Sequence, residues 1–129
     1  MPLDIGFLLP DGRYDLRLQF DGDGCYWFLH PWFTRVQRTT GSYVDLYGDA
    51  DFHEANGLDA LIGAMAEARA AAARQPTEWR VHTGTQLVPV RQELYATVER
   101  VEILRSIERF QALLEEAKVS RKTLAFRGD

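Results

Sequence analysis

The sequence predicts a single α+β domain with a mostly antiparallel sheet of about five to six strands, on which two long helices and one short helix pack. Three observations support this class. Short apolar stretches end at turn signals, as they do in β-hairpins. Two longer segments place apolar residues at helical spacing. The 129 residues suffice for one hydrophobic core but not for two, so we expect one domain over residues 1–129.

Two strands are predicted at the start of the chain. Residues 3–9 place Ile5, Phe7 and Leu9 on one face, and the Pro-Asp-Gly at 10–12 favours a tight turn. Residues 14–20 then alternate apolar with polar side chains, which predicts an antiparallel hairpin with one buried face. On that face we expect Tyr14, Leu16, Leu18 and Phe20; in water we expect Asp15, Arg17, Gln19 and Asp21.

The next segment is harder to interpret. After an Asp-Gly-Asp-Gly turn at 21–24, residues 25–29 are apolar on both faces, which fits either a central strand or the start of a buried helix. Pro31 favours a break there, followed by a short helix from about Trp32 to Thr40 that Gly41 ends. Residues 42–48, Ser-Tyr-Val-Asp-Leu-Tyr-Gly, return to a strand pattern.

A long helix is predicted from about Asn56, with Asn56 or a neighbour as its cap and Gln75-Pro76 as its end. The buried stripe that we expect on it consists of Leu58, Leu61, Ile62, Met65 and Ala72.

Residues 77–90 read as one or two strands with a turn or bulge at Gly84, and residues 92–98 are ambiguous, with a strand favoured. Thr97 is the predicted cap of a second long helix that runs to about Lys118, and residues 122–126 predict a short closing strand.

Composition limits the function. The chain is 46% hydrophobic and 26% charged, like an ordinary globular protein, and contains no apolar run of the roughly 18 residues that a membrane helix needs. An acid stands where an export signal carries basic residues, so we expect a cytoplasmic protein. One cysteine excludes an internal disulfide, and no phosphate-binding or zinc-protease motif is present.

Charge is distributed unevenly along the chain. Residues 1–60 contain ten acids and four bases, whereas residues 61–129 contain nine acids and eleven bases. An acidic half disfavours nucleic acid as a ligand, because phosphates are bound through clustered Lys and Arg. The same acidity suits a basic protein partner.

Acids and aromatic residues crowd together between positions 43 and 59. Some of these acids suit the start of the helix that follows, where each stabilises the helix dipole by about 0.3–1 kcal/mol. The helix does not account for all of them, and an aromatic anchor surrounded by charge is typical of a protein-binding hot spot. We therefore predict a partner-binding surface formed by Trp32, Asp45, Tyr47, Asp49, Asp51 and Glu54.

Two chemical alternatives start from the same region. Asp49, Asp51 and His53 are spaced by two residues, so an extended segment would point all three to one side, as metal ligands require. The spacing does not match a calcium-binding loop, and we predict no metal or cofactor. Cys25 could act as a nucleophile only beside an oriented base such as a histidine, and no local motif provides one. We predict no catalytic residue.

Residues 39–70 resemble a group of small bacterial proteins, some of which are predicted immunity proteins. The resemblance is carried by the Thr-Gly step at Thr40–Gly41, the Tyr-Val-Asp-Leu-Tyr-Gly-Asp segment that ends at Asp49, and the Leu-rich helix after it. Leu46 departs from it, since a proline is expected there. The resemblance implies a cytosolic, non-catalytic α+β binder that blocks a basic toxin.

The prediction is therefore a non-catalytic protein-binding module with an acidic surface. One alternative is a small enzyme or small-ligand-binding protein whose site combines carboxylates with one of the histidines at 30, 53 and 82. Another is a structural subunit of a larger assembly, which an uncovered apolar helix face would indicate.

Overall fold

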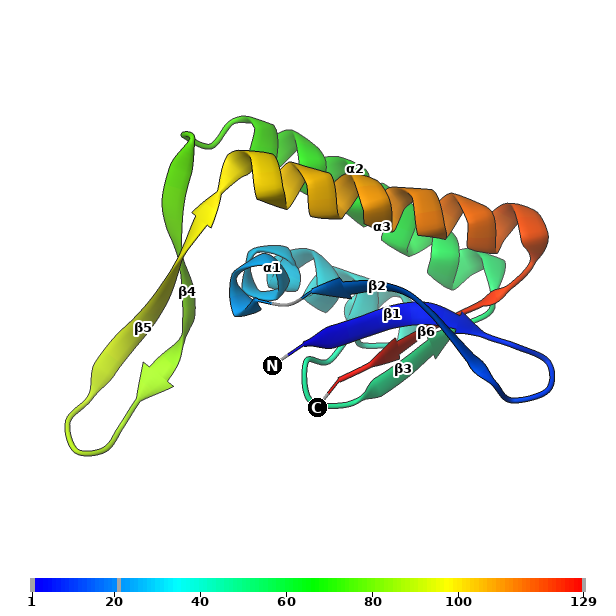
Figure 1. Cartoon of the computed structure of the whole chain (residues 1–129), viewed down its shortest axis with the longest axis horizontal. Helices are drawn as coiled ribbons and strands as arrows, with labels where there is room; N and C mark the ends of the chain where they lie inside the picture. Colours follow the sequence, from blue (N-terminus) through cyan, green and yellow to red (C-terminus); the bar gives the residue numbers. More distant parts are fainter. Residues whose placement is uncertain (1, 21, 129) are drawn as a thin grey trace.

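The computed structural model describes residues 2–20 and 22–128 and confirms the α+β class (Figure 1). Asp21, and with it part of the predicted turn at 21–24, lies outside the described residues. No helix in the described part of the chain is both long and apolar enough to cross a bilayer. The elements are β1 (Leu3–Leu8), β2 (Tyr14–Phe20), α1 (Asp23–Thr40), β3 (Asp49–Phe52), α2 (Ala55–Ala73), β4 (Glu78–Gln86), β5 (Gln92–Glu99), α3 (Arg100–Ser120) and β6 (Thr123–Arg127).

The main sheet has the strand order β2-β1-β6-β3, and all neighbouring strands are antiparallel. The helices lie on one side of it (Figure 1). Toward them the sheet points side chains that alternate along each strand and are fully buried, among them Leu3, Ile5, Phe7, Leu124 and Phe126. Burying one such side chain contributes about 1.5–3 kcal/mol, so this layer is the core that holds the sheet and the helices together.

The predicted first hairpin is confirmed, but half of its predicted buried face is wrong. The register between β1 and β2 shifts after Ile5, so that Ile5 pairs with Leu18 and Gly6 with Leu16. Arg17 is the extra residue of this β-bulge, and an extra residue reverses the alternation of side chains. Leu18 and Phe20 therefore point into the core as predicted, whereas Leu16 is 51% exposed. Tyr14 lies half-buried on the outer face of the sheet, where its hydroxyl donates to the Ala125 carbonyl at 3.2 Å.

The predicted break at Pro31 is also wrong. Residues 23–40 form one helix of 18 residues, with Pro31 inside it and Gly41 as the predicted end, at φ 82°. Proline removes one helical hydrogen bond and costs free energy in a helix interior. The burial of large side chains on both sides of Pro31 offsets that cost: Tyr26, Phe28, Leu29 and Phe33.

Residues 42–48 do not form the predicted strand. Val44 and Leu46 are buried as a strand pattern would require, but residues 42–48 form no ladder with a neighbouring strand, and two of their backbone groups bond to side chains. The Val44 carbonyl accepts from the Tyr26 hydroxyl at 2.7 Å, and the Tyr47 N–H donates to the Asp45 carboxylate at 2.9 Å. The aspartate bond closes a local turn, so the strand begins only at Asp49.

Both long helices are present, but their predicted caps are wrong. The α2 stripe is confirmed, with Ile62 only half-buried. Glu54 occupies the cap position of α2 without a side-chain cap bond, and Thr97 lies within β5, not at the start of α3. Since β5 runs directly into α3, the first turn of α3 is anchored by tertiary contacts instead. The Arg100 N–H donates to the Thr77 carbonyl at 2.9 Å.

Strands β4 and β5 form a second sheet of their own, a long hairpin beside the helices instead of part of the main sheet (Figure 1). The base of the hairpin packs on α1, where the Trp79 and Phe28 rings lie 5.6 Å apart. The predicted bulge at Gly84 is confirmed by a register shift between His82 and Gly84. Beyond this bulge the hairpin extends away from the rest of the molecule.

Replacing Gly6 tests the bulge. A β-carbon at Gly6 would overlap the backbone carbonyl of Asp15, which cannot move without breaking the β1–β2 pairing. We expect Gly6→Ala to lower the free energy of unfolding by about 1–3 kcal/mol, measured by urea denaturation. Gly63→Ala is the matched control, because Gly63 lies in α2 with open space around it and alanine there should stabilise by up to about 1 kcal/mol. Equal unfolding midpoints for the two variants would contradict the bulge.

Candidate partner-binding surface

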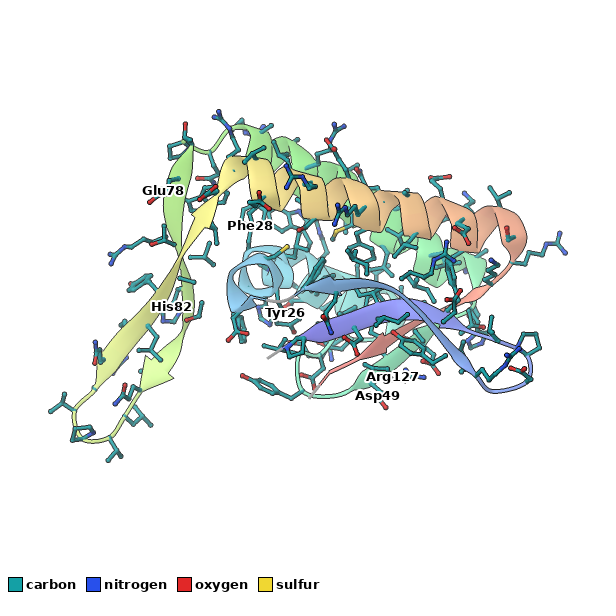
Figure 2. All side chains as sticks on the ribbon, in the orientation of Figure 1. Tyr26, Phe28, Asp49, Glu78, His82 and Arg127 are labelled. Atoms are coloured by element: carbon teal, nitrogen blue, oxygen red, sulfur yellow. The ribbon has the colours of Figure 1, made fainter. Side chains whose placement is uncertain are left out.

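The outer face of the main sheet is not covered by any of the described helices. Across it, Asp4 of β1, Arg127 of β6 and Asp49 of β3 stand next to one another in register. Gln19 of β2 extends this row, because its amide donates to the Asp4 carboxylate at 2.6 Å. Figure 2 shows Asp49 and Arg127 side by side on the sheet. The row therefore crosses all four strands and is charged at its centre.

Arg127 is the hub of this row. Its Nη1 lies 2.7 Å from a carboxylate oxygen of Asp51, and its Nε lies 3.9 Å from one of Asp49. Two of the predicted site residues are thus brought together, but a guanidinium partly neutralises them. Ion pairs this exposed contribute only about 0–1 kcal/mol, so a partner could compete for both carboxylates. Asp49 is the more available of the two, with 66% of its side chain exposed.

Tyr14 lies beside Arg127, whose guanidinium carbon is 5.7 Å from the centre of the ring. Burial, followed by the negative charge of Asp4, raises the pKa of Tyr14 to about 12, although Arg127 acts in the opposite direction. The hydroxyl is therefore protonated at neutral pH. It remains a hydrogen-bond donor to Ala125 and fixes the ring across the strands.

Asp45 and Tyr47 lie next to the row, in the loop that leads into β3. The loop is held against the end of β6 because the Gly128 N–H donates to the Gly48 carbonyl at 2.8 Å. The Asp45 carboxylate is occupied on one oxygen by the Tyr47 N–H, and the Tyr47 side chain is 57% exposed. These two predicted residues therefore extend the surface at the start of β3.

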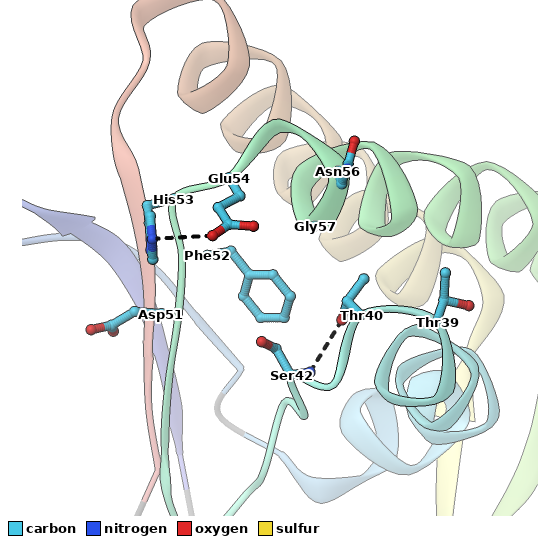
Figure 3. Close-up of a pocket in the computed structure, with 9 residues that line it drawn as sticks. All are labelled: Thr39, Thr40, Ser42, Asp51, Phe52, His53, Glu54, Asn56 and Gly57. Atoms are coloured by element: carbon cyan, nitrogen blue, oxygen red, sulfur yellow. Dashed lines mark hydrogen bonds and ion pairs between the residues drawn. The ribbon is translucent and has the colours of Figure 1, made fainter.

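Glu54 follows the other end of β3 and is highly exposed, with only a long contact of 3.9 Å to His53. Its carboxylate lies on the side of Phe52, opposite Asp51 (Figure 3), so we refer to Asp4, Asp45, Asp49 and Asp51 as the acidic face, without Glu54. Asp59 is not part of it, because that carboxylate pairs with Lys118 of α3 at 2.8 Å.

Trp32 is not brought together with the acids. Its ring stacks at 5.4 Å on Phe28, which in turn contacts Trp79 of β4. The continuous α1 explains this placement, since residues four apart share one side of a helix. Trp32 lies on the hairpin side of α1, whereas the loop with Asp45 contacts α1 through Tyr26.

Four residues of the surface were missing from the predicted site: Asp4, Tyr14, Gln19 and Arg127. Each lies in a strand that was predicted, except Arg127, which comes one residue after the predicted end of the last strand. Each points outward. What brings them together is the strand order, in which β6 lies between β1 and β3. Alternation within a strand does not indicate which strands are neighbours, and for Tyr14 it predicted the wrong face because of the β-bulge.

A hollow of about 480 Å³ lies next to the acidic face, between the end of α1 and the start of α2 (Figure 3). Phe52 stands in the middle of its lining, with the hydroxyls of Thr40 and Ser42 on one side. His53 and Glu54 form the opposite rim, both largely exposed to solvent. The hollow can accept a small polar molecule, to which His53, Glu54 and the two hydroxyls would offer hydrogen bonds.

The other two histidines lie elsewhere. His30 bonds through Nε2 to the Tyr43 hydroxyl at 2.9 Å, and burial lowers the pKa of His30. His82 lies on the hairpin, 2.6 Å from a carboxylate oxygen of Glu93 (Figure 2 labels His82). Within residues 2–20 and 22–128, no three His, Cys, Asp or Glu side chains are grouped as metal ligands. Two histidines thus lie beside carboxylates: His53 with Glu54 borders the hollow, whereas His82 with Glu93 lies exposed on the hairpin.

Cys25 provides a test of whether the chain carries a reactive nucleophile. Burial raises the pKa of the Cys25 thiol to about 12, and a weaker contact with Ser106 opposes the shift. At pH 8 the thiolate fraction would then be on the order of 10⁻⁴. We expect iodoacetamide to label the native chain at least about a hundredfold more slowly than the urea-unfolded chain, as followed by mass spectrometry. Similar rates in both states would show that the thiol is accessible and activated.

A function for this chain has to rest on the geometry of the acidic face and of the hollow beside it. Neither protein-family models, nor curated proteins, nor solved structures match the chain.

Proposed function

We propose that this protein is a non-catalytic protein-binding module that recognises a basic surface of its partner through the acidic face. The observation that carries the proposal is the gathering of four carboxylates on and beside an uncovered sheet face, where Arg127 pairs with only two of them. Like charges repel, so this arrangement costs free energy in the isolated protein. A cationic partner would offset that repulsion when it binds.

The edge of the sheet supports the same reading. β3 is the outermost strand beside β6, so its other edge has no strand neighbour in the described structure. Both Asp49 and Asp51 belong to this strand. A basic segment of the partner that lies along β3 would meet carboxylates on the outer face of the sheet and unpaired backbone groups at its edge.

The resemblance of residues 39–70 to predicted immunity proteins suggests a class for the partner. In this proposal the partner is a toxin with a basic surface, and binding in the cytoplasm blocks its active site or a neighbouring surface. Nucleic acid does not suit the acidic face, because phosphates and carboxylates repel each other.

The hollow beside the acidic face favours a second candidate, the binding of a small polar molecule. His53, Glu54 and the hydroxyls of Thr40 and Ser42 would supply the hydrogen bonds. The two candidates are separable, because the substitution His53→Ala should weaken a small ligand and leave a protein bound to the outer sheet face unaffected.

The main test removes charge from the acidic face. We expect D45N/D49N/D51N to weaken binding of a basic partner by at least about tenfold, mainly by slowing association, and to reduce its salt dependence. The free energy of unfolding should change by no more than about 1 kcal/mol, because the ion pairs lost are exposed. Partner binding is measured by surface plasmon resonance and unfolding by urea denaturation.

The partner is first captured from a lysate of the source organism on the immobilised wild-type chain, identified by mass spectrometry and purified. E67Q/E102Q/E115Q is the matched control: it removes the same charge from exposed positions on α2 and α3. Equal affinity of both triple variants, or equal loss in both, would remove the acidic face as the binding surface.

A further inference from the structure

The end of the β4–β5 hairpin carries an unusual amount of exposed apolar surface. Nine large hydrophobic side chains are exposed in the described chain, and five of them fall between residues 87 and 95. Tyr95 lies on the opposite face of β5 from Leu94, against Arg80 and His82, so we call the other four the apolar tip: Leu87 (70% exposed), Val88 (78%), Val90 (66%) and Leu94 (38%). Single exposed apolar residues are common on protein surfaces, but a contiguous group indicates an interaction site.

The tip is also poorly supported by the rest of the molecule. The hairpin is fixed at its base, where Val98 is buried against Gly24 and Trp79 contacts Phe28. Beyond the bulge at Gly84 it extends away from the helices and the main sheet (Figure 1). A two-stranded hairpin is marginally stable in water by itself, and in the described structure β4 and β5 pair only with each other. Apolar surface and unpaired strand edges therefore occur at the same place.

We propose that the apolar tip is covered by the apolar tip of a second copy of this chain, in a two-fold symmetric dimer. The free edge of β5 supports this occupant. In the described structure β5 pairs only with β4, so its other edge presents unpaired backbone groups to which a strand of a second copy can bind.

The charge pattern supports self-association as well. If the segment from residue 90 to 94 pairs antiparallel with itself about a two-fold axis at Gln92, Val90 lies opposite Leu94 of the second copy. Arg91 then lies opposite Glu93, and the symmetry repeats both pairs. Within one chain Arg91 and Glu93 already lie on one face, 3.4 Å apart. The two copies would thus combine apolar with apolar and opposite with opposite charge.

The other polar side chains near the end of the hairpin bond to one another within the hairpin. Glu93 also accepts from Thr85 at 2.9 Å and pairs with His82. The guanidinium of Arg80 lies 4.5 Å from the centre of the Tyr95 ring. Arg91, with 78% of its side chain exposed, is therefore the charged group near the tip that is most available to a second copy.

The dimer leaves the acidic face free, since the end of the hairpin points away from the main sheet that contains β3 (Figure 1). D45N/D49N/D51N should therefore dimerise like the wild type. Failure of the dimer and failure of the proposed function are consequently distinguishable.

The experiment measures the mass of the full chain by sedimentation equilibrium from the micromolar to the millimolar range. We expect a dimer for the wild type and a monomer for L87S/V88S/V90S, with unchanged far-UV circular dichroism. V101S/V119S is the matched control, because it removes exposed apolar side chains from α3, and it should remain dimeric.

Charge reversal tests the pairing. R91E and E93R should each be monomeric where the wild type is dimeric, because like charges then face each other twice. An equimolar mixture of the two variants should form a heterodimer, because every acid then faces an arginine. A mixture that remains monomeric would overturn the pairing.

Three other results would overturn the proposal. They are a wild type that is monomeric at every concentration, a dimer that survives L87S/V88S/V90S, and a monomer that binds phosphatidylcholine vesicles through the tip.

Discussion

The burial of α1 is the constraint on which the other parts of this fold depend. Its aromatic side chains face three different neighbours. Phe33 contacts Phe110 of α3, with ring centres 6.3 Å apart. Phe28 contacts Trp79 at the base of the hairpin, and Tyr26 bonds to the Val44 carbonyl in the loop before β3. One helix thus positions the hairpin and also sets the start of the strand that carries Asp49 and Asp51, so the apolar tip and the acidic face share one support.

Polar–apolar patterns predicted the type of element correctly where the element buries one face against a single neighbouring element. The alternation in residues 14–20 and the apolar stripe of α2 each indicated the correct element. Errors arose where tertiary contacts outweigh a local preference. Proline is disfavoured in a helix interior, but the buried side chains on both sides of Pro31 stabilise a continuous helix. The bulge opposite Ile5 left no trace in the polar–apolar pattern, because Leu16 is apolar although it faces outward.

The candidate site shows the same division. Asp45, Tyr47, Asp49, Asp51 and Glu54 follow one another closely in the chain, and the structure keeps them close. Arg127 and Asp4 join them through the order of the strands, which no local pattern encodes. Trp32 separates from them because a continuous helix turns it toward Phe28. The clustering of acids that follow one another in the sequence was therefore predictable. The contact with the Arg127 guanidinium, which partly neutralises two of them, was not.

The position of β6 has a consequence for how this chain is made. β6 comes after all other elements in the sequence, but it lies between β1 and β3 in the sheet. During synthesis on the ribosome, β1 and β2 can pair early, while β3 has no place to attach until residues 123–127 have emerged. Contacts between such distant segments close slowly, and β1 keeps an unpaired edge in the meantime. A chain that ends before residue 123 would therefore lack the strand that joins β3 to β1, and both of these strands would keep a free edge.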